Sequence, residues 1–157
     1  MATDHHERPM GGHPYRHLII MAALSLVSMY FLMYAMVDQP ANVYGNLNQL
    51  FMAGLMTAPM ILIELIVMRG MYANRRNNVL IAAISVAVGI LMFVCIRQQA
   101  AIADEQFLRS MIPHHSSGIL MCQRAKLSDA QLRELCDSII SSQQEEIALM
   151  AALLDRQ

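Results

Sequence analysis

The stretch LIIMAALSLVSMYFLMYAMV, residues 18–37, decides the fold because it carries no charged side chain over its whole length. Two later stretches are similar: residues 50–68 hold one charged side chain, Glu64, and residues 79–96 hold none. As helices, all three are long enough to cross a hydrocarbon core about 30 Å thick. A soluble helix is rarely apolar on every side over such a length. We therefore predict an all-α protein with three transmembrane helices.

The composition and the ends of these stretches agree with that prediction. The chain is 56% hydrophobic and 15% charged, and its net charge of −1 gives no basis for nucleic-acid binding. The first span has a long apolar core and is followed by Asp38-Gln-Pro-Ala-Asn, so we expect it to be kept rather than cleaved as a signal peptide. We predict three parts: a polar tail (1–17), a three-span membrane bundle in contact with lipid (18–96) and a helical hairpin (97–157).

The arginines predict the orientation in the membrane. The connection over residues 38–49 has no Lys or Arg, whereas the tail and the connection after the second span carry Arg8, Arg16, Arg69, Arg75 and Arg76. Positive charge favours the cytoplasmic side. We therefore expect a multi-pass protein of a bacterial inner membrane, with a cytoplasmic N-terminus and a periplasmic C-terminal hairpin.

The hairpin itself has readable boundaries. Ser128-Asp-Ala-Gln131 forms a capping box, so a helix should begin just after Ser128 and the preceding one should end near Lys126. The bridge after the third span consists of good helix formers, which predicts one long helix kinked at Pro113. Two helices alone bury little surface. We therefore expect the hairpin either to form a homodimeric four-helix bundle, half from each chain, or to dock on the membrane bundle.

The hairpin also contains the segment MIPHHSSGILMC, residues 111–122. At about 100° per residue, its metal-binding side chains share roughly a third of the helix circumference. They are Met111, His114, His115, Met121 and Cys122. Imidazole, thioether and thiolate together select soft or borderline ions, with Cu(I) first. The alternative is that Met and Cys only fill the core.

The second hairpin helix has one apolar face, and its pairing with the first predicts neighbours. The face consists of Leu132, Cys136, Ile139, Ile140, Gln143, Ile147, Met150 and Leu154. Antiparallel pairing places His115 opposite Ile140, with Gln143 at the level of the histidines. A buried amide needs a partner, so we predict a hydrogen bond from Gln143 to His114 or His115. Cys122 and Cys136 form a disulfide or stay reduced as ligands; both alternatives remain open.

Residues 104–154 resemble a known bacterial family. The segments FLRSMIPHHSSGILM (107–121) and LRELCDSIISSQQEEIALM (132–150) carry the resemblance. They are similar to the ferritin-like "domain of unknown function" family numbered three-zero-five, which includes CopM-like copper-binding proteins. The resemblance implies a periplasmic helical domain and copper binding or tolerance without known catalysis. It points to Met111, His114, His115, Met121, Gln143, Glu146 and Met150. In this chain Gly118 replaces the usual Ala, and Cys122 and Cys136 replace small residues.

Three further features have alternative interpretations. Glu64 lies in a span, where a carboxylate is costly; we favour a bonded group, with Ser85 or Ser25 as partner, over a metal path. The tail histidines His5, His6, His13 and His17, with Met10, are typical of adventitious metal binding. Soft side chains gather at the span ends nearest the hairpin, which we interpret as packing before metal binding: Met29, Met33, Met36, Met52, Met56, Met92 and Cys95.

The function that these patterns favour is membrane-anchored, periplasmic binding of a soft metal ion, Cu(I), in copper tolerance or handling. We expect no enzyme activity and no metal requirement for folding. The alternative is a non-catalytic interaction module whose His/Met stripe is packing. A di-iron enzyme is disfavoured because such sites use Glu-x-x-His, and here Met111 stands three residues before His114.

Overall fold

The computed structural model describes residues 14–157, which form five α-helices and two short 3-10 helices without a β-strand. In order they are α1 (Pro14–Leu32), η1 (Met33–Met36), η2 (Pro40–Asn42), α2 (Leu47–Val67), α3 (Arg75–Gln98), α4 (Asp104–Arg124) and α5 (Ala130–Leu154). Three segments are long and apolar enough to cross a membrane: Pro14–Met36, Leu47–Val67 and Arg75–Gln98. The predicted all-α class and the three candidate spans are therefore confirmed.

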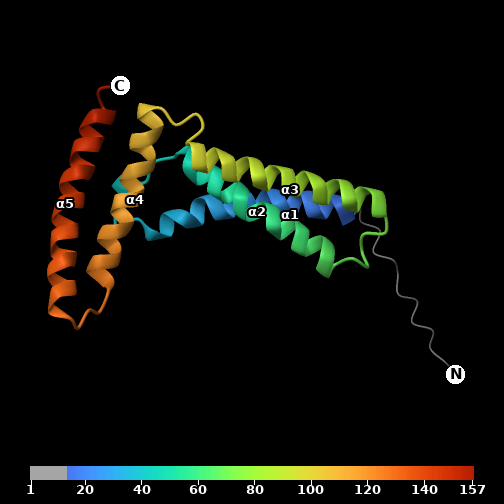
Figure 1. The fold of residues 1–157 in the computed structure, drawn as a ribbon, viewed down its shortest axis with the longest axis horizontal. Coiled ribbons are helices and arrows are strands. Elements are labelled where there is room, and N and C mark those ends of the chain that lie inside the picture. Colours follow the sequence, from blue (N-terminus) through green and yellow to red (C-terminus); the bar gives the residue numbers. More distant parts are fainter. Residues whose placement is uncertain (1–13) are drawn as a thin grey trace.

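The three candidate spans lie side by side, with α2 in contact with both α1 and α3 (Figure 1). Small residues bring α2 and α3 close together, since a Cβ added at Gly89 would lie 3.2 Å from the Cβ of Ala58. The outer surfaces stay apolar and uncovered: Ile66, for example, is 71% exposed. Such a surface is suited to contact with lipid rather than water.

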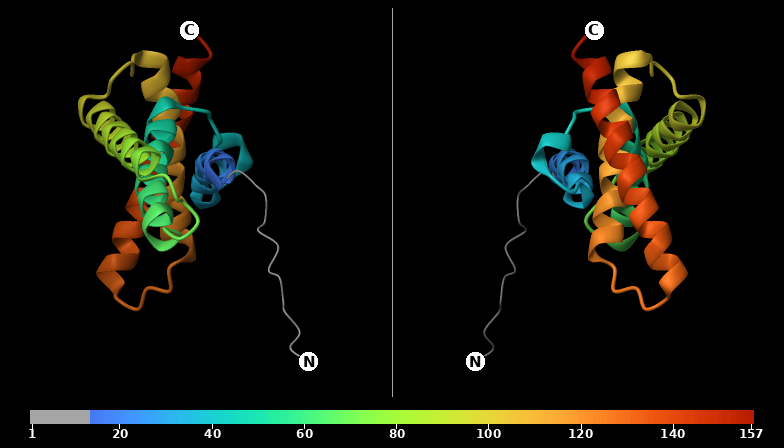
Figure 2. Two further views of the ribbon diagram at one scale, coloured as in Figure 1. Left: turned by 90° about the vertical axis from the view of Figure 1, so that its right-hand side faces the viewer. Right: turned by 90° about the vertical axis from the view of Figure 1, so that its left-hand side faces the viewer.

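The hairpin of α4 and α5 lies across one end of this bundle, with α4 between α5 and the spans (Figures 1 and 2). We call this the junction end; residues 33–47 and 99–103 form it. The hairpin core is buried between α4 and α5 and consists of Leu108, Ile112, Ile119, Ile147 and Met150. Tyr44, from the connection between α1 and α2, packs against this core. Docking on the membrane bundle, one of the two expected arrangements, is thus present within a single chain.

The predicted continuous helix from the third span into the hairpin is wrong. The helix α3 ends at Gln98, and Gln99 and Ala101 adopt left-handed backbone conformations with φ of 51° and 59°. The Gln99 side chain exchanges hydrogen bonds with the Asn48 side chain, at 3.0 and 3.2 Å, and donates to the Ile96 carbonyl at 2.7 Å. These bonds offset a left-handed conformation that costs about 1–3 kcal/mol. The chain therefore turns, and α4 crosses the bundle.

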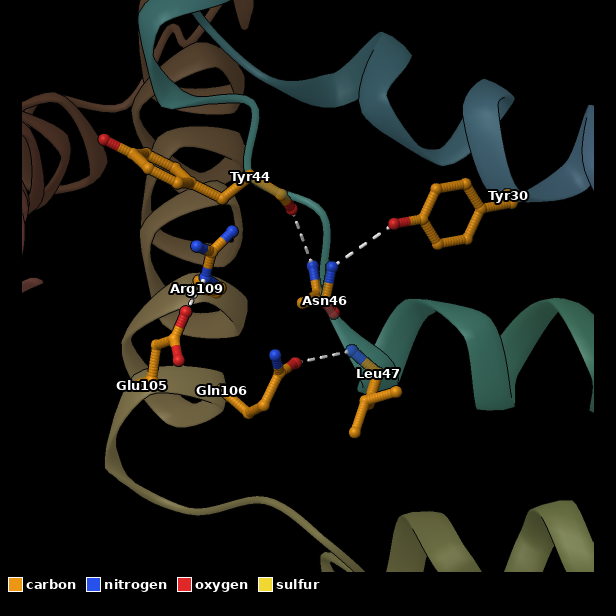
Figure 3. Close-up of polar contacts among 7 residues, drawn as sticks. All are labelled: Tyr30, Tyr44, Asn46, Leu47, Glu105, Gln106 and Arg109. Carbon is orange, nitrogen blue, oxygen red and sulfur yellow. Dashed lines mark hydrogen bonds and ion pairs between the residues drawn. The ribbon is translucent and has the colours of Figure 1, made fainter.

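Two contacts fix α4 against the first connection. The Asp38 N–H donates to Ser116 Oγ at 2.8 Å, and the Ser116 hydroxyl donates in return to the Asp38 carboxylate. Ser116 is fully buried, so its hydroxyl depends on these partners rather than on water. The Leu47 N–H, at the start of α2, donates to Gln106 Oε1 at 3.0 Å (Figure 3). Each bond satisfies a polar group that docking removes from solvent.

Asn46 organises the start of α2 beside these contacts. Its side-chain oxygen accepts from the Gln49 N–H at 2.9 Å, which caps the helix. Its Nδ2 donates to the Tyr44 carbonyl at 3.1 Å (Figure 3). The Asn46 N–H donates to the Tyr30 hydroxyl at 3.2 Å, which ties the connection to α1. On α4, Arg109 and Glu105 form a 2.7 Å ion pair one turn apart.

The start of α5 differs from its prediction by one residue. Asp129, not Ser128, caps the helix: its carboxylate accepts from the N–H groups of Gln131 and Leu132 at 2.7 and 3.1 Å. The Ser128 carbonyl instead accepts from Arg133 at 2.8 Å. A carboxylate cap also interacts favourably with the helix dipole, which explains why Asp129 is preferred. The preceding helix ends at Arg124, close to the predicted Lys126.

We predict that Ser116→Ala loosens the hairpin from the bundle. The change removes two hydrogen bonds, one of them to a carboxylate, and should lower the free energy of unfolding by about 2–3 kcal/mol. Thermal unfolding in detergent and hydrogen exchange of α4 would measure the effect. Ser117→Ala is the matched control, because that hydroxyl only donates to the His114 carbonyl of its own helix. Equal effects of the two variants would contradict the proposed role of Ser116.

Candidate metal site

The His/Met segment lies in α4, which has two neighbours. On one side α4 packs against α5, and on the other it contacts η1, η2 and α2. The predicted single stripe of ligands is therefore divided between two faces of the helix. The division matters because a metal ion needs its ligands on the same side.

Met111 and His114 share the face toward the spans. Both line a cavity of about 350 Å³ between α4, η1 and the start of α2, which we call the junction cavity. They are three residues apart on one helix, so their side chains are neighbours. His114 is exposed and Met111 is half-buried, with one side against the hairpin core. This is the pair of predicted ligands that the fold brings together in an open space.

His115 faces the other way, toward α5. Its Nε2 lies 2.7 Å from Glu146 Oε2, and its Nδ1 lies 3.0 Å from the Met111 carbonyl oxygen. Both partners are acceptor atoms, so each ring nitrogen of His115 faces an oxygen. A metal ion at Nε2 would have to displace Glu146. The predicted ligand Glu146 is thus engaged with His115. The centroids of the His114 and His115 rings are 6.0 Å apart.

The two hairpin cysteines are joined in a disulfide. Cys122 and Cys136 have Cα atoms 5.2 Å apart, which decides between the two alternatives that the sequence left open. The bond closes the end of the hairpin near the α4–α5 connection. A sulfur in a disulfide is not a thiolate, so the predicted ligand Cys122 does not offer a thiolate in this state. Cys95 in α3 is a free thiol.

The predicted hydrogen bond from Gln143 to the histidines is absent, and the two helices pair up to six residues, more than one turn, out of the expected register. His115 lies opposite Glu146 instead of Ile140. Gln143 lies against Gly118, and its Oε1 is buried without a hydrogen-bond partner in the described part of the chain. The Cys122–Cys136 bond, beside the irregular connection over residues 125–129, holds this register.

Two further predicted ligands do not join the others. Met150 is a buried member of the hairpin core. Met121 lies in the last turn of α4 and is 58% exposed. Residues 14–157 contain no group of three or more His, Cys, Asp or Glu side chains placed to hold a metal ion. Methionine offers a thioether, a ligand that prefers soft ions such as Cu(I). Met111 with His114 fits that chemistry.

The other polar candidates are accounted for by local bonds. Glu64 accepts a hydrogen bond from the Tyr72 hydroxyl at 3.3 Å, whereas Ser85 and Ser25, the predicted partners, bond within their own helices. Burial, followed by the nearby Glu64, raises the pKa of Tyr72 above its ordinary value, which keeps this phenol a donor. Of the tail residues, His5, His6, Met10 and His13 lie outside the described residues, and His17 is exposed.

The residues that sequence reasoning missed are Asp38, Ser116 and Gln106, which position α4 rather than bind metal. Asp38 precedes Pro40 in a polar connection that has no periodicity, and Ser116 follows the histidines without a partner nearby in sequence. Only the crossing of α4 over the bundle brings them together. A serine between two buried apolar positions, Ile112 and Ile119, is the one signal that pointed to a buried hydroxyl.

We predict that Gly118 and Gln143 are energetically coupled. A Cβ at position 118 would overlap Gln143 Oε1, so Gly118→Ala must displace this amide. In a Gln143→Ala background, the same change should stabilise α4 by about 1 kcal/mol, the ordinary helix preference of Ala over Gly. In the native background most of that gain should be lost. Thermal unfolding of the four proteins of this cycle measures the coupling; additive effects would mean that the two residues do not touch.

Comparisons with known proteins place the chain in a family. A family model described as "Domain of unknown function (DUF305)" matches residues 67–154, so the likeness includes α3 as well as the hairpin and exceeds the predicted residues 104–154. The "Uncharacterized protein L153" of Acanthamoeba polyphaga mimivirus is 31% identical over 141 residues, which cover 88% of this chain and 91% of that protein. No solved structure gives a significant match. This chain therefore belongs to the family described as domain of unknown function DUF305.

Proposed function

We propose that this protein is a membrane-anchored binder of a soft metal ion, Cu(I), and that α4 carries the site. The observation that carries the proposal is the placement of Met111 and His114 side by side on the junction cavity. A thioether and an imidazole are neutral, polarisable donors, which suit a monovalent soft ion. The role that follows is copper tolerance or handling rather than catalysis.

The two adjacent histidines differ in whether their ring nitrogens are engaged by other residues. His114 lines the cavity, whereas both ring nitrogens of His115 are engaged by Glu146 and the Met111 carbonyl. The first contact of the ion is therefore with His114 and Met111. The carbonyl that holds His115 belongs to Met111, so this bond orients the backbone beside the ligand in the way that outer partners orient metal sites.

Copper is favoured over zinc by the same donors. Zinc sites are built from thiolate, imidazole and carboxylate, and residues 14–157 bring no three such groups together. The disulfide between Cys122 and Cys136 also withdraws two thiols from that set. An oxidised disulfide agrees with an extracytoplasmic location of the hairpin. The arginine distribution supports the same location, in the periplasm of a bacterial inner membrane.

An interaction module remains the second candidate, and a specific observation favours it. Met150 is buried in the hairpin core, and His115 and Glu146 link α4 to α5 in the manner of a structural pair. On this alternative the hairpin displays a surface to a partner or to a second copy of the chain. The two candidates differ in whether His114 binds an ion.

The copper proposal predicts that His114→Ala with His115→Ala weakens Cu(I) binding by at least about tenfold, or 1.4 kcal/mol. The full chain in detergent is titrated with Cu(I) against a competing chelator. All proteins carry His5→Ala, His6→Ala and His13→Ala, so that the tail does not contribute. His17→Ala is the matched control, because this exposed histidine lies on α1 away from the junction cavity. If the double variant binds as tightly as its parent, the interaction module is the better proposal.

The proposed orientation predicts that a reporter enzyme active only in the periplasm is active when fused after Gln157. The reason is the distribution of positive charge: one connection carries Arg69, Arg75 and Arg76, whereas the connection at residues 38–49 has no Lys or Arg. The same reporter inserted at Asn74 should be silent. Activity at Asn74 with silence after Gln157 would invert the orientation.

A further inference from the structure

Most of the junction cavity is lined by parts of the chain outside α4. Two methionines come from η1, at the end of the first span, and one comes from the first turns of α2: Met33, Met36 and Met52. We propose that these three thioethers complete a Cu(I) site with Met111 and His114. The inference deepens the proposed function and rests on it, but it moves the site from the hairpin alone to the junction with the membrane bundle. Met33, Met36 and Met52 all precede the matched family segment at residues 67–154.

The local structure explains why these side chains converge. Met33 and Met36 are the first and last residues of η1, and side chains three residues apart in a 3-10 helix eclipse one another. Both therefore leave the chain on one side, toward the cavity. Met52 follows the Asn46 cap of α2 by six residues, close to the same end of the bundle. Met111 and His114 complete the lining from α4.

The polar groups around the cavity are already occupied. Asn46 and Gln49 bond to each other, with Nδ2 to Oε1 at 3.0 Å, and Asn48 bonds to Gln99 and Ser110. Among the described residues, the lining of the cavity contains no Asp, Glu or Cys. The donors that face the space are the thioethers and the His114 imidazole. Such a neutral set leaves a bound Cu(I) with its single positive charge, and it suits Ag(I) equally.

Met36 and Met52 are not core side chains: they are 51% and 39% exposed beside the cavity, whereas Met150 in the hairpin core is 9% exposed. Four thioethers and one imidazole line one space of about 350 Å³, which is the donor set that the proposed site uses. The site also requires docking, since α4 supplies two ligands and the spans supply three. Bound metal should therefore stabilise the docked hairpin, as any ligand stabilises the state that binds it.

The test compares two triple substitutions in the full chain, again with His5, His6 and His13 replaced by Ala. The first is Met33→Leu, Met36→Leu and Met52→Leu, which keeps side-chain volume nearly unchanged. The second, a matched control, is Met56→Leu, Met68→Leu and Met71→Leu, which alters three exposed methionines that do not line the cavity. Cu(I) and Ag(I) titrations against a chelator give affinity. X-ray absorption counts sulfur and nitrogen neighbours of the copper, and circular dichroism checks folding.

We expect the cavity triple to weaken Cu(I) binding by at least about tenfold and to reduce the sulfur neighbours, while the control triple leaves both unchanged. If the cavity triple binds as the parent does, but Met111→Leu with His114→Ala loses binding, the hairpin alone holds the ion. That result overturns this inference and leaves the proposed function standing. Equal losses in the two triples also overturn it, because the effect would not depend on the cavity. A parent that binds no Cu(I) overturns both.

Discussion

The buried contact between Ser116 and Asp38 is the constraint on which the arrangement of this protein depends. It joins the middle of α4 to the connection between the first two spans. The Asp38 N–H donates to the Ser116 hydroxyl, and that hydroxyl donates to the Asp38 carboxylate. Hydrogen bonds that involve a charged group contribute about 1.5–3 kcal/mol. This contribution matters because a two-helix hairpin buries little apolar surface and gains little stability from it. Gln106 makes a second such contact, because its side-chain oxygen accepts from the Leu47 N–H at the start of α2. With both in place, α4 lies across the bundle instead of extending from it.

This crossing decides the chemistry of the His/Met segment. A free amphipathic helix would present Met111, His114, His115 and Cys122 together, but α4 has a neighbour on each side. The face toward α5 takes His115 into a pair with Glu146 and Cys122 into a disulfide. The face toward the spans leaves Met111 and His114 beside the junction cavity. The hairpin is thus stabilised by one half of the motif, and the other half faces an open space.

The disulfide and the helix register depend on each other. Cys122 and Cys136 meet beside the irregular connection over residues 125–129, and α5 pairs with α4 up to six residues away from the register expected from the sequence. That shift brings Glu146 to His115 and sets the Gln143 amide over Gly118. An alanine at position 118, as the resembling family usually has, would meet this amide. The glycine therefore lets this amide lie directly against α4.

Much of the fold follows from the sequence alone, because hydrophobicity over a span length is a local property. The three apolar stretches, the two hairpin helices and the apolar face of α5 are all within a few residues of their predicted positions. The candidate residues Met111, His114 and His115 were likewise recognisable from their types and spacing.

What the sequence did not determine are the end of α3, the register of the hairpin and the division of the ligand stripe. Gln99 turns because Asn48, far away in the chain, bonds to it, and α4 crosses because Asp38 meets Ser116. Such contacts join residues that no local pattern relates, so only the tertiary structure decides them.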